Sequence, residues 1–215
     1  MSDKYLLLEQ NLTAFSINLT DKQKQLLLEY CYLLQKWNKY YSLTAINNID
    51  DMLIYHILDG MTLVDNIYLN KYNINNVIDI GSGMGVPAII LAICFPQLNI
   101  YALDCNTKKT IFLKQVAIEL NLINLHIINS KVENYQPIIK FNVITARAFA
   151  NIDKLITLTR HIIDEDGFYL LMKAKKTHEE LEGIDNIDSQ IFNTKIPNHS
   201  EVRCIVKINL TLRGI

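Results

Sequence analysis

Residues 77–87 read Val-Ile-Asp-Ile-Gly-Ser-Gly-Met-Gly-Val-Pro, an apolar run that meets an acid and then three glycines at alternate positions. An apolar helical pattern follows at residues 88–93. Strand, tight loop and helix in this order are typical of the site where open α/β sheets bind nucleotide-like ligands. Glycines in such a loop accept positive φ angles and let a ligand approach the backbone closely. The stretch therefore predicts an α/β fold with a ligand site at Gly81 and Gly83.

The residues around the glycines narrow the choice of ligand. The dinucleotide fingerprint G-x-G-x-x-G needs a glycine where this chain has Val86. A phosphate-binding loop needs a lysine followed by serine or threonine after its glycines, and this loop has neither. The carboxylate of Asp79 is expected to repel a pyrophosphate and to favour a cation. S-adenosyl-L-methionine carries a sulfonium, an ammonium and no phosphate, so we predict it as the cofactor.

A second acid supports a cofactor site over a purely structural turn. Residues 98–103 form a second predicted strand, and Asp104 stands at its tip. It follows the glycine loop at the distance of about 20 residues at which such an acid is expected. An acid there accepts hydrogen bonds from the ribose hydroxyls of a bound nucleoside.

The composition of the chain limits the classes of protein to which it can belong. The chain has 215 residues, half of them hydrophobic, and a net charge of −1. No stretch approaches the roughly 18 apolar residues of a membrane span, and the first residues do not read as a signal peptide. The four cysteines lack metal-binding spacing, so we expect a reduced, cytoplasmic protein with no metal site and no membrane contact. The near-neutral charge counts against an extensive nucleic-acid surface and leaves room for a local patch of lysines.

The remaining sequence predicts one compact unit. A capping box at Thr20–Gln23 precedes a helical periodicity, and Asp50 or Asp51 is expected to cap a second helix. Further helices are expected at 108–120 and 152–163, and further strands at 125–129, 141–145, 167–173, 190–196 and 203–210. The last two strands are expected to pair as an antiparallel hairpin at the edge of a doubly wound, mostly parallel seven-stranded sheet. We divide the chain into a helical extension, residues 1–70, packed on a cofactor-binding domain, residues 71–215.

Seven short motifs together resemble those of one known family. They are Lys36-Trp37-Asn38, Leu43-Thr44-Ala45-Ile46, His56-Ile57-Leu58-Asp59, the glycine-loop stretch from Asp79 to Pro87, Phe112-Leu113-Lys114-Gln115-Val116-Ala117, Ser130-Lys131-Val132-Glu133 and Arg147-Ala148-Phe149-Ala150. With these motifs the chain resembles the RsmG (GidB) family of bacterial 16S ribosomal RNA guanine-N7 methyltransferases. The likeness runs from about Leu26 to Ile208 and is far more specific than a glycine loop alone.

The resemblance implies an S-adenosylmethionine-dependent methyltransferase with a Rossmann-like fold, acting on the N7 atom of a specific guanine in the small ribosomal subunit. It implies cofactor contacts at Gly81, Gly83, Val86, Asp104, Val132, Glu133 and Arg147. Arg147 is also the best candidate for a contact with the substrate or transition state, and no catalytic residue is certain. Three positions depart from the family pattern: Ala88, Ala174 and Cys204. Ala174 and Cys204 weaken any catalytic role for the C-terminal segment in which they lie.

The residues after the fourth predicted strand agree with transfer to N7. Guanine N7 has a free lone pair, so no proton must be removed first. Residues 145–149 lack the prolines of amino-group methyltransferases, and Cys105 has no adjacent base that would activate it for cytosine chemistry. Phe149 offers a stacking face or a core side chain, and Arg147 a site contact or an ion pair with Glu133. We interpret His56 as a structural histidine.

Three other readings stay open. They are a nicotinamide-dependent oxidoreductase, which Val86 disfavours, a methyltransferase for another acceptor, and a non-catalytic ribosome-assembly factor on the same fold. The expected partner is 16S ribosomal RNA within the small subunit, and the expected state is a monomer. The near-neutral charge favours an assembled subunit over naked RNA as substrate.

Overall fold

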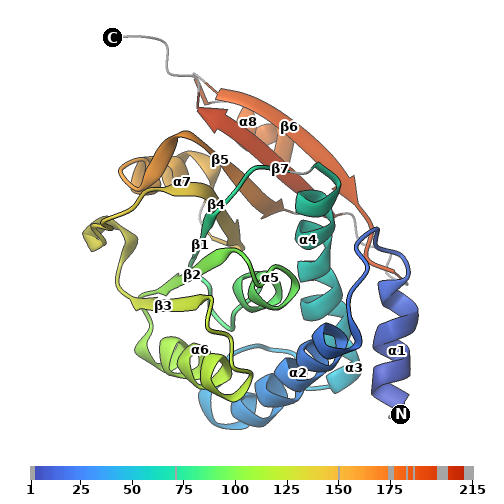
Figure 1. The fold of residues 1–215 in the computed structure, drawn as a ribbon. Coiled ribbons are helices and arrows are strands. Elements are labelled where there is room, and N and C mark those ends of the chain that lie inside the picture. The colour runs from blue at the N-terminus through green and yellow to red at the C-terminus, as the bar shows by residue number, and fades with distance from the viewer. Residues whose placement is uncertain are drawn as a thin grey trace.

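A computed structural model describes residues 3–70, 72–149, 151–173, 177–182, 184–185, 187–197 and 203–210, without the side chains of residues 69 and 178. These residues form a seven-stranded sheet in the order β3-β2-β1-β4-β5-β7-β6 (Figure 1). The strands are β1 (Asn76–Ile80), β2 (Asn99–Asp104), β3 (Leu125–Asn129), β4 (Phe141–Arg147), β5 (Ile163–Lys173), β6 (Ile187–Thr194) and β7 (Arg203–Leu210). The first five run parallel, β7 runs antiparallel to β5, and β6 pairs with β7 at the edge. The predicted sheet and its edge hairpin are confirmed.

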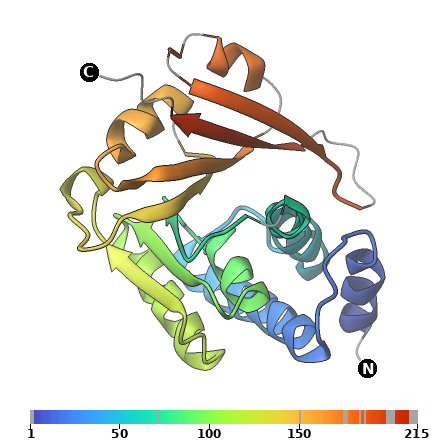
Figure 2. The same ribbon diagram turned by 45° about the horizontal axis from the view of Figure 1, so that its top comes forward.

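Helices cover both faces of the sheet. They are α1 (Asp3–Leu12), α2 (Asp21–Tyr41), α3 (Ile49–Met52), the π-helical turn η1 (Leu53–Leu58), α4 (Asp59–Asn70), α5 (Ala88–Cys94), α6 (Thr107–Glu119), the 3₁₀ turn η2 (Val132–Asn134), α7 (Ile152–Thr159) and α8 (Thr177–Leu181). One core joins α1, α2, α4, α5 and α6 to one face of the sheet, and a second core joins α7 to the other. Figure 2 shows α2, α5 and α6 side by side beneath the strands.

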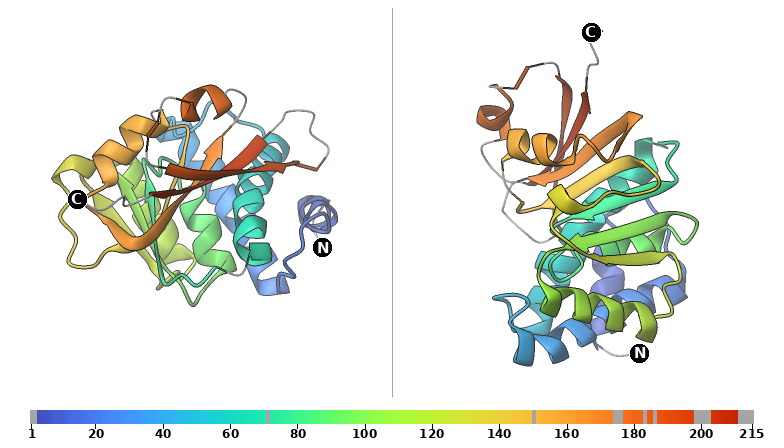
Figure 3. Two further views of the ribbon diagram at one scale, coloured as in Figure 1. Left: turned by 90° about the horizontal axis from the view of Figure 1, so that it is seen from above. Right: turned by 90° about the vertical axis from the view of Figure 1, so that its left-hand side faces the viewer.

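Strand alternation decides which core each residue enters. In β1, Val77 belongs to the core of α5 and α6, and its neighbours Ile78 and Ile80 belong to the core of α7. Side chains two residues apart on a strand share a face, so β1 is buried on both of its faces from Val77 to Ile80. The side view at the right of Figure 3 places the N-terminal helices at the bottom and the β6–β7 hairpin at the top.

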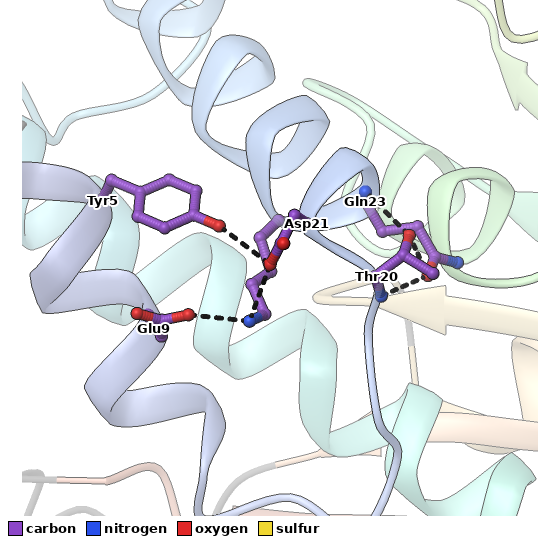
Figure 4. Close-up of polar contacts among 6 residues, drawn as sticks. Tyr5, Glu9, Thr20, Asp21 and Gln23 are labelled. Carbon is purple, nitrogen blue, oxygen red and sulfur yellow. Dashed lines mark hydrogen bonds and ion pairs between the residues drawn. The ribbon is translucent and has the colours of Figure 1, made fainter. Parts of the chain in front are cut away.

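The N-terminal helices are tied together by polar contacts (Figure 4). The predicted capping box is present: the Gln23 amide donates to Thr20 Oγ1 at 3.2 Å and the Thr20 amide donates to Gln23 Oε1 at 3.0 Å. The hydroxyl of Tyr5 in α1 donates to Asp21 at 3.3 Å. Gln23 Nε2 also donates to the carbonyls of Ile93 and Cys94, which are left free at the end of α5. The helical extension therefore reaches the helix that follows the glycine loop.

Several predicted boundaries were wrong. Asn48, rather than Asp50 or Asp51, caps the helix that begins at Ile49, since its side chain accepts from the Asp50 amide at 2.9 Å. The predicted helix 152–163 ends at Thr159, and β5 begins at Ile163 instead of Gly167. Gly167 lies inside the strand at an irregularity in the β4–β5 pairing, where a Cβ would lie 2.9 Å from the Phe141 carbonyl oxygen. The strand predicted at residues 190–196 is β6, which begins at Ile187 and ends at Thr194.

Candidate active site

The glycine loop is fastened to the neighbouring strand. The amides of Gly81 and Ser82 donate to the Leu103 carbonyl of β2 at 2.8 and 3.0 Å. Gly81 has a φ angle of 70°, and a Cβ there would lie 2.8 Å from a ring carbon of Phe149. Gly85 has a φ angle of 100°, and a Cβ there would lie 2.3 Å from the Ile89 side chain. Both positions thus need glycine, because the turn requires positive φ and the neighbouring side chains leave no space.

Asp104 holds the loop from the adjacent strand tip. Its two carboxylate oxygens accept from the Gly83 amide and the Asn106 amide, each at 2.8 Å. The side chain is buried, and Asn106 in turn caps α6 by accepting from the amides of Lys108 and Lys109. A carboxylate oxygen has more than one lone pair, so these bonds leave acceptor capacity for a ligand. The ribose contact of Asp104 stays a prediction.

A cavity of 490 Å³ opens at the carboxyl ends of the parallel strands. It is lined by Leu43, Asp59, Thr62, Gly81, Ser82, Gly83, Met84, Val86, Lys109, Arg147, Ala148, Met172, Lys173, Arg203, Cys204 and Ile205. The cavity brings together four of the predicted cofactor residues, Gly81, Gly83, Val86 and Arg147. Asp104, Val132 and Glu133 do not line it; Val132 is buried in η2 and Glu133 is exposed beside it.

Arg147 pairs with Asp59 of α4 and not with Glu133. Its Nη1 lies 3.0 Å from Asp59 Oδ2 and donates to the Tyr55 carbonyl at 3.2 Å. Arg203 of β7 approaches the other oxygen of the same carboxylate, with Nε at 3.5 Å. Asp59 is nearly buried, so one carboxylate holds an arginine from each of two strands. Sequence reasoning missed this role, although Asp59 closes the recognised motif at residues 56–59.

The charged lining of the cavity is mostly cationic. Lys109, Arg147, Lys173 and Arg203 line it, with Asp59 as the one carboxylate among the described lining residues. Lys173 forms an ion pair of 2.7 Å with Glu180 of α8, which also accepts from the Ile152 amide. Such a wall attracts an anionic group, for example a carboxylate or a phosphate.

Asp79 plays a different part from the one expected. Its side chain is fully buried and does not line the cavity. Burial raises the pKa of the Asp79 carboxyl to about 7, although Ser82, Arg147 and the Ala88 amide act to lower it. The argument that Asp79 repels an anionic ligand was therefore wrong, because the carboxyl lies beneath the loop and is held toward its neutral form.

The helical extension supports the site from the other side. The Tyr30 hydroxyl donates to the Met84 carbonyl in the glycine loop at 2.8 Å. Asn38 accepts from the Thr44 amide at 2.9 Å and donates to the Ile46 carbonyl at 3.2 Å, which fixes the segment that carries Leu43 to the cavity wall.

His56 lies behind this segment, where Nε2 lies 2.9 Å from Thr44 Oγ1. The side chain is buried, and burial lowers the pKa of His56 to about 4. This placement supports the interpretation of His56 as a structural histidine.

The described residues offer neither a metal cluster nor a membrane-spanning helix. Among these residues, no group of three or more His, Cys, Asp and Glu side chains could hold a metal ion. No helix of the described ranges is long and apolar enough to cross a membrane. Cys204 lies at the cavity with Sγ 3.2 Å from Thr177 Oγ1. Ala174, the other departure in the tail, lies outside the described residues.

The fold of the chain matches that of solved methyltransferase structures. The chain has the fold of S-adenosylmethionine-dependent methyltransferases: it matches a Methanococcus maripaludis protein solved as a candidate member of that class with a TM-score of 0.58, 15% identity, and coverage of 94% of this chain and 99% of that one. Residues 23–204 match the family model GidB, rRNA small subunit methyltransferase G. The chain belongs to this family.

Relatives in the family match over nearly their whole length. The ribosomal RNA small subunit methyltransferase G of Hydrogenovibrio crunogenus is 39% identical over 91% of this chain and 89% of its own. That of Chromobacterium violaceum is 39% identical over 94% of this chain and 96% of its own. The family resemblance and the fold class expected from the sequence are both confirmed.

Proposed function

We propose that this protein transfers the methyl group of S-adenosyl-L-methionine to the N7 atom of a guanine in 16S ribosomal RNA of the small ribosomal subunit. The observation that carries this function is the 490 Å³ cavity, in which the glycine loop meets Arg147 and Arg203. The family membership selects the ribosomal acceptor, since the relatives are named as methyltransferases of small-subunit ribosomal RNA.

The residues of the site fit the cofactor. Gly81 and Gly83 both line the cavity, and a Cβ at Gly83 would meet no atom closer than 3.7 Å, so a ligand can approach the backbone closely at Gly83. Arg147 and Lys109 give this wall the cationic groups that suit the carboxylate of a methionine moiety. Asp104 would accept from the ribose hydroxyls, Val86 would contact the ligand from the loop, and Val132 and Glu133 would contact it from the turn after β3.

Catalysis in this site rests on positioning. The bound cofactor supplies an electrophilic methyl group on a sulfonium, and guanine N7 accepts it through a lone pair without prior loss of a proton. The carboxylate of Asp59 is engaged by Arg147 and Arg203, and His56 lies in the interior with a lowered pKa, so neither is placed as a general base. Arg147 orients the reactants, and orientation of this kind is worth up to about 7–11 kcal/mol of the barrier.

The direct test is methyl transfer from labelled S-adenosylmethionine to small ribosomal subunits that lack the modification, with the product identified as 7-methylguanosine. We expect transfer by the wild-type protein and none by Gly83→Asp. That side chain would be strained at a φ angle of 58° and would add a carboxylate beside that of Asp104. Cofactor binding without transfer would point to another acceptor or to a non-catalytic assembly factor.

Four further expectations belong to this proposal. The protein acts as a monomer in the cytoplasm, and an assembled subunit is methylated faster than protein-free RNA. Residues 1–70 form an extension of the domain made by residues 71–215. Support for close packing between the two comes from the core that α1, α2 and α4 share with α5. Equal rates on subunits and on protein-free RNA would contradict the preference for an assembled subunit.

A further inference from the structure

A second cavity lies on the surface between α2 and α6. It has a volume of 340 Å³ and is lined by Lys36, Trp37, Tyr40, Tyr41, Gln115 and Glu119. We call it the aromatic groove. Figure 2 shows the two helices that form its sides next to each other beneath the sheet.

The aromatic rings of the groove form a fixed platform with an exposed edge. Trp37 and Tyr41 are stacked, with ring centroids 5.0 Å apart and planes at 29°. Phe112, which is fully buried, supports Trp37 from below with centroids 5.8 Å apart. Tyr40 projects beside them and is 81% exposed. A platform held by the core loses little conformational entropy when a flat ligand binds to it.

The charges around the groove favour a polyanion. Residues 30–49 contain two lysines and residues 105–118 contain three, and neither segment contains a carboxylate, although the whole chain carries a net charge of −1. Lys36, Lys39, Lys108 and Lys114 are exposed, and none of them has an ion pair within the described ranges. The one acid of the groove, Glu119, accepts a hydrogen bond from Gln115 at 2.8 Å.

The groove lies close to the main cavity. Lys109 of α6 lines the main cavity and Gln115 lines the groove, and six residues span about 9 Å along a helix. On the other side, Leu43 lines the main cavity three residues after Tyr40. A nucleotide neighbouring the one held in the main cavity would therefore reach the groove.

We propose that the aromatic groove binds an unpaired base of the RNA substrate by stacking on the exposed ring of Tyr40, against the edge of the Trp37–Tyr41 pair, while the surrounding lysines contact the phosphates. This inference rests on the proposed function, since it assigns the groove to the same substrate. Aromatic side chains within a basic surface are the usual means of holding single-stranded RNA, because every base has a stacking face. Bases inside a duplex are not available to such a platform.

Trp37 is the single tryptophan of the chain, so its fluorescence reports occupation of the groove directly. The probe is a single-stranded oligoadenylate of about ten nucleotides, within the usual site size of such surfaces, compared with a blunt RNA duplex of equal length. We expect quenching by the single strand and much less by the duplex. Tyr40→Ala should weaken binding of the single strand by about 5- to 150-fold, and Tyr40→Phe should preserve it.

Tyr32→Ala is the matched control, because Tyr32 is an exposed tyrosine of the same helix that does not line the groove. Equal affinities of Tyr40→Ala and Tyr32→Ala for the oligonucleotide would overturn the proposal. Quenching by the RNA duplex as strong as that by the single strand would also overturn it. Thermal unfolding of both variants should match the wild type, since both side chains are exposed.

Methyl transfer separates this proposal from the proposed function. We expect Tyr40→Ala to raise KM for the small subunit and to leave the affinity for S-adenosylmethionine unchanged. Transfer by Tyr40→Ala with an unaltered KM would refute binding of an RNA base in the groove and leave the proposed function intact. Loss of oligonucleotide binding in Tyr40→Ala, together with no transfer by the wild type, would support the groove and refute the proposed function.

Discussion

The hydroxyl of Tyr30 in α2 donates a 2.8 Å hydrogen bond to the carbonyl of Met84 in the glycine loop. Tyr30 is fully buried, and burial raises the pKa of its hydroxyl well above the usual range, so the group stays neutral and keeps its proton to donate. With Leu103 and Asp104 holding the same loop from the sheet, the N-terminal helix supplies a third point of attachment. The loop is therefore held from both sides before any ligand binds.

Tyr30→Phe tests that attachment. The variant leaves the Met84 carbonyl without its donor, which is expected to cost about 1–3 kcal/mol of the free energy of unfolding. It should also weaken binding of S-adenosylmethionine, because the loop loses one restraint. Urea unfolding and calorimetric titration measure the two effects. Tyr32→Phe, on the exposed face of the same helix, is the control, and equal behaviour of the two variants would contradict the role given to Tyr30.

Asp79→Asn should change how stability depends on pH. The pKa of Asp79 is about 7 in the folded protein and near 3.8 when unfolded, so the folded state keeps a proton that the unfolded state loses between these values. The wild-type free energy of unfolding therefore acquires a term that falls as pH rises from about 4 to about 7. The variant lacks this term. Its free energy of unfolding, relative to that of the wild type, should therefore increase by on the order of 4 kcal/mol between about pH 4 and pH 8.

The measurement for Asp79 is urea unfolding at several pH values. Asp153→Asn is the control, because Asp153 is exposed in the first turn of α7. A constant difference between wild type and Asp79→Asn across this range would show that the carboxyl is ionised in the folded state.

His56→Gln should have the opposite dependence. The pKa of His56 is about 4 in the folded protein and near 6.5 when unfolded, so below pH 6.5 the unfolded state takes up a proton that the folded state refuses. Wild-type stability therefore decreases as pH falls from about 6.5 to 4. The stability advantage of the wild type over the variant should shrink by about 2 kcal/mol between pH 7 and pH 5. His126→Gln, at an exposed position of β3, should show no such change; a parallel response of both variants would count against the buried neutral imidazole.

Arg147→Lys should reduce methyl transfer at least about tenfold, because Nη1 alone contacts both Asp59 and the Tyr55 carbonyl, and an ammonium in its place would leave no second nitrogen to contact a ligand. The free energy of unfolding should change much less, since the positive charge beside Asp59 is kept. Calorimetric binding of S-adenosylmethionine and initial rates on small subunits measure the effect. Arg160→Lys, at an exposed position after α7, serves as control. Methyl transfer at the wild-type rate by Arg147→Lys would contradict the role given to Arg147 in the site.

The sequence was sufficient to predict those parts of the fold that are determined by residues close together in the chain. The glycine loop, the capping box at Thr20 and the strand at Leu125–Asn129 all follow from residues within a few positions of each other. The pairing of Arg147 with Asp59 joins residues 88 positions apart, and nothing in either segment specifies the other. The burial of Asp79 was equally hidden, because an acid before a glycine loop looks the same whether it faces the ligand or the interior.

The pairing of Asp59 with both Arg147 and Arg203 has a consequence for when the cavity can form during translation. Asp59 and Arg147 belong to segments that leave the ribosome before β7, whereas Arg203 begins β7. A nascent chain that has emerged only through β5 has its glycine loop and its first arginine but lacks one wall of the cavity. Because a domain generally folds as a unit, the cavity is complete only once β7 has paired with β5. A ligand therefore meets the complete wall of the cavity only after β7 has been synthesised.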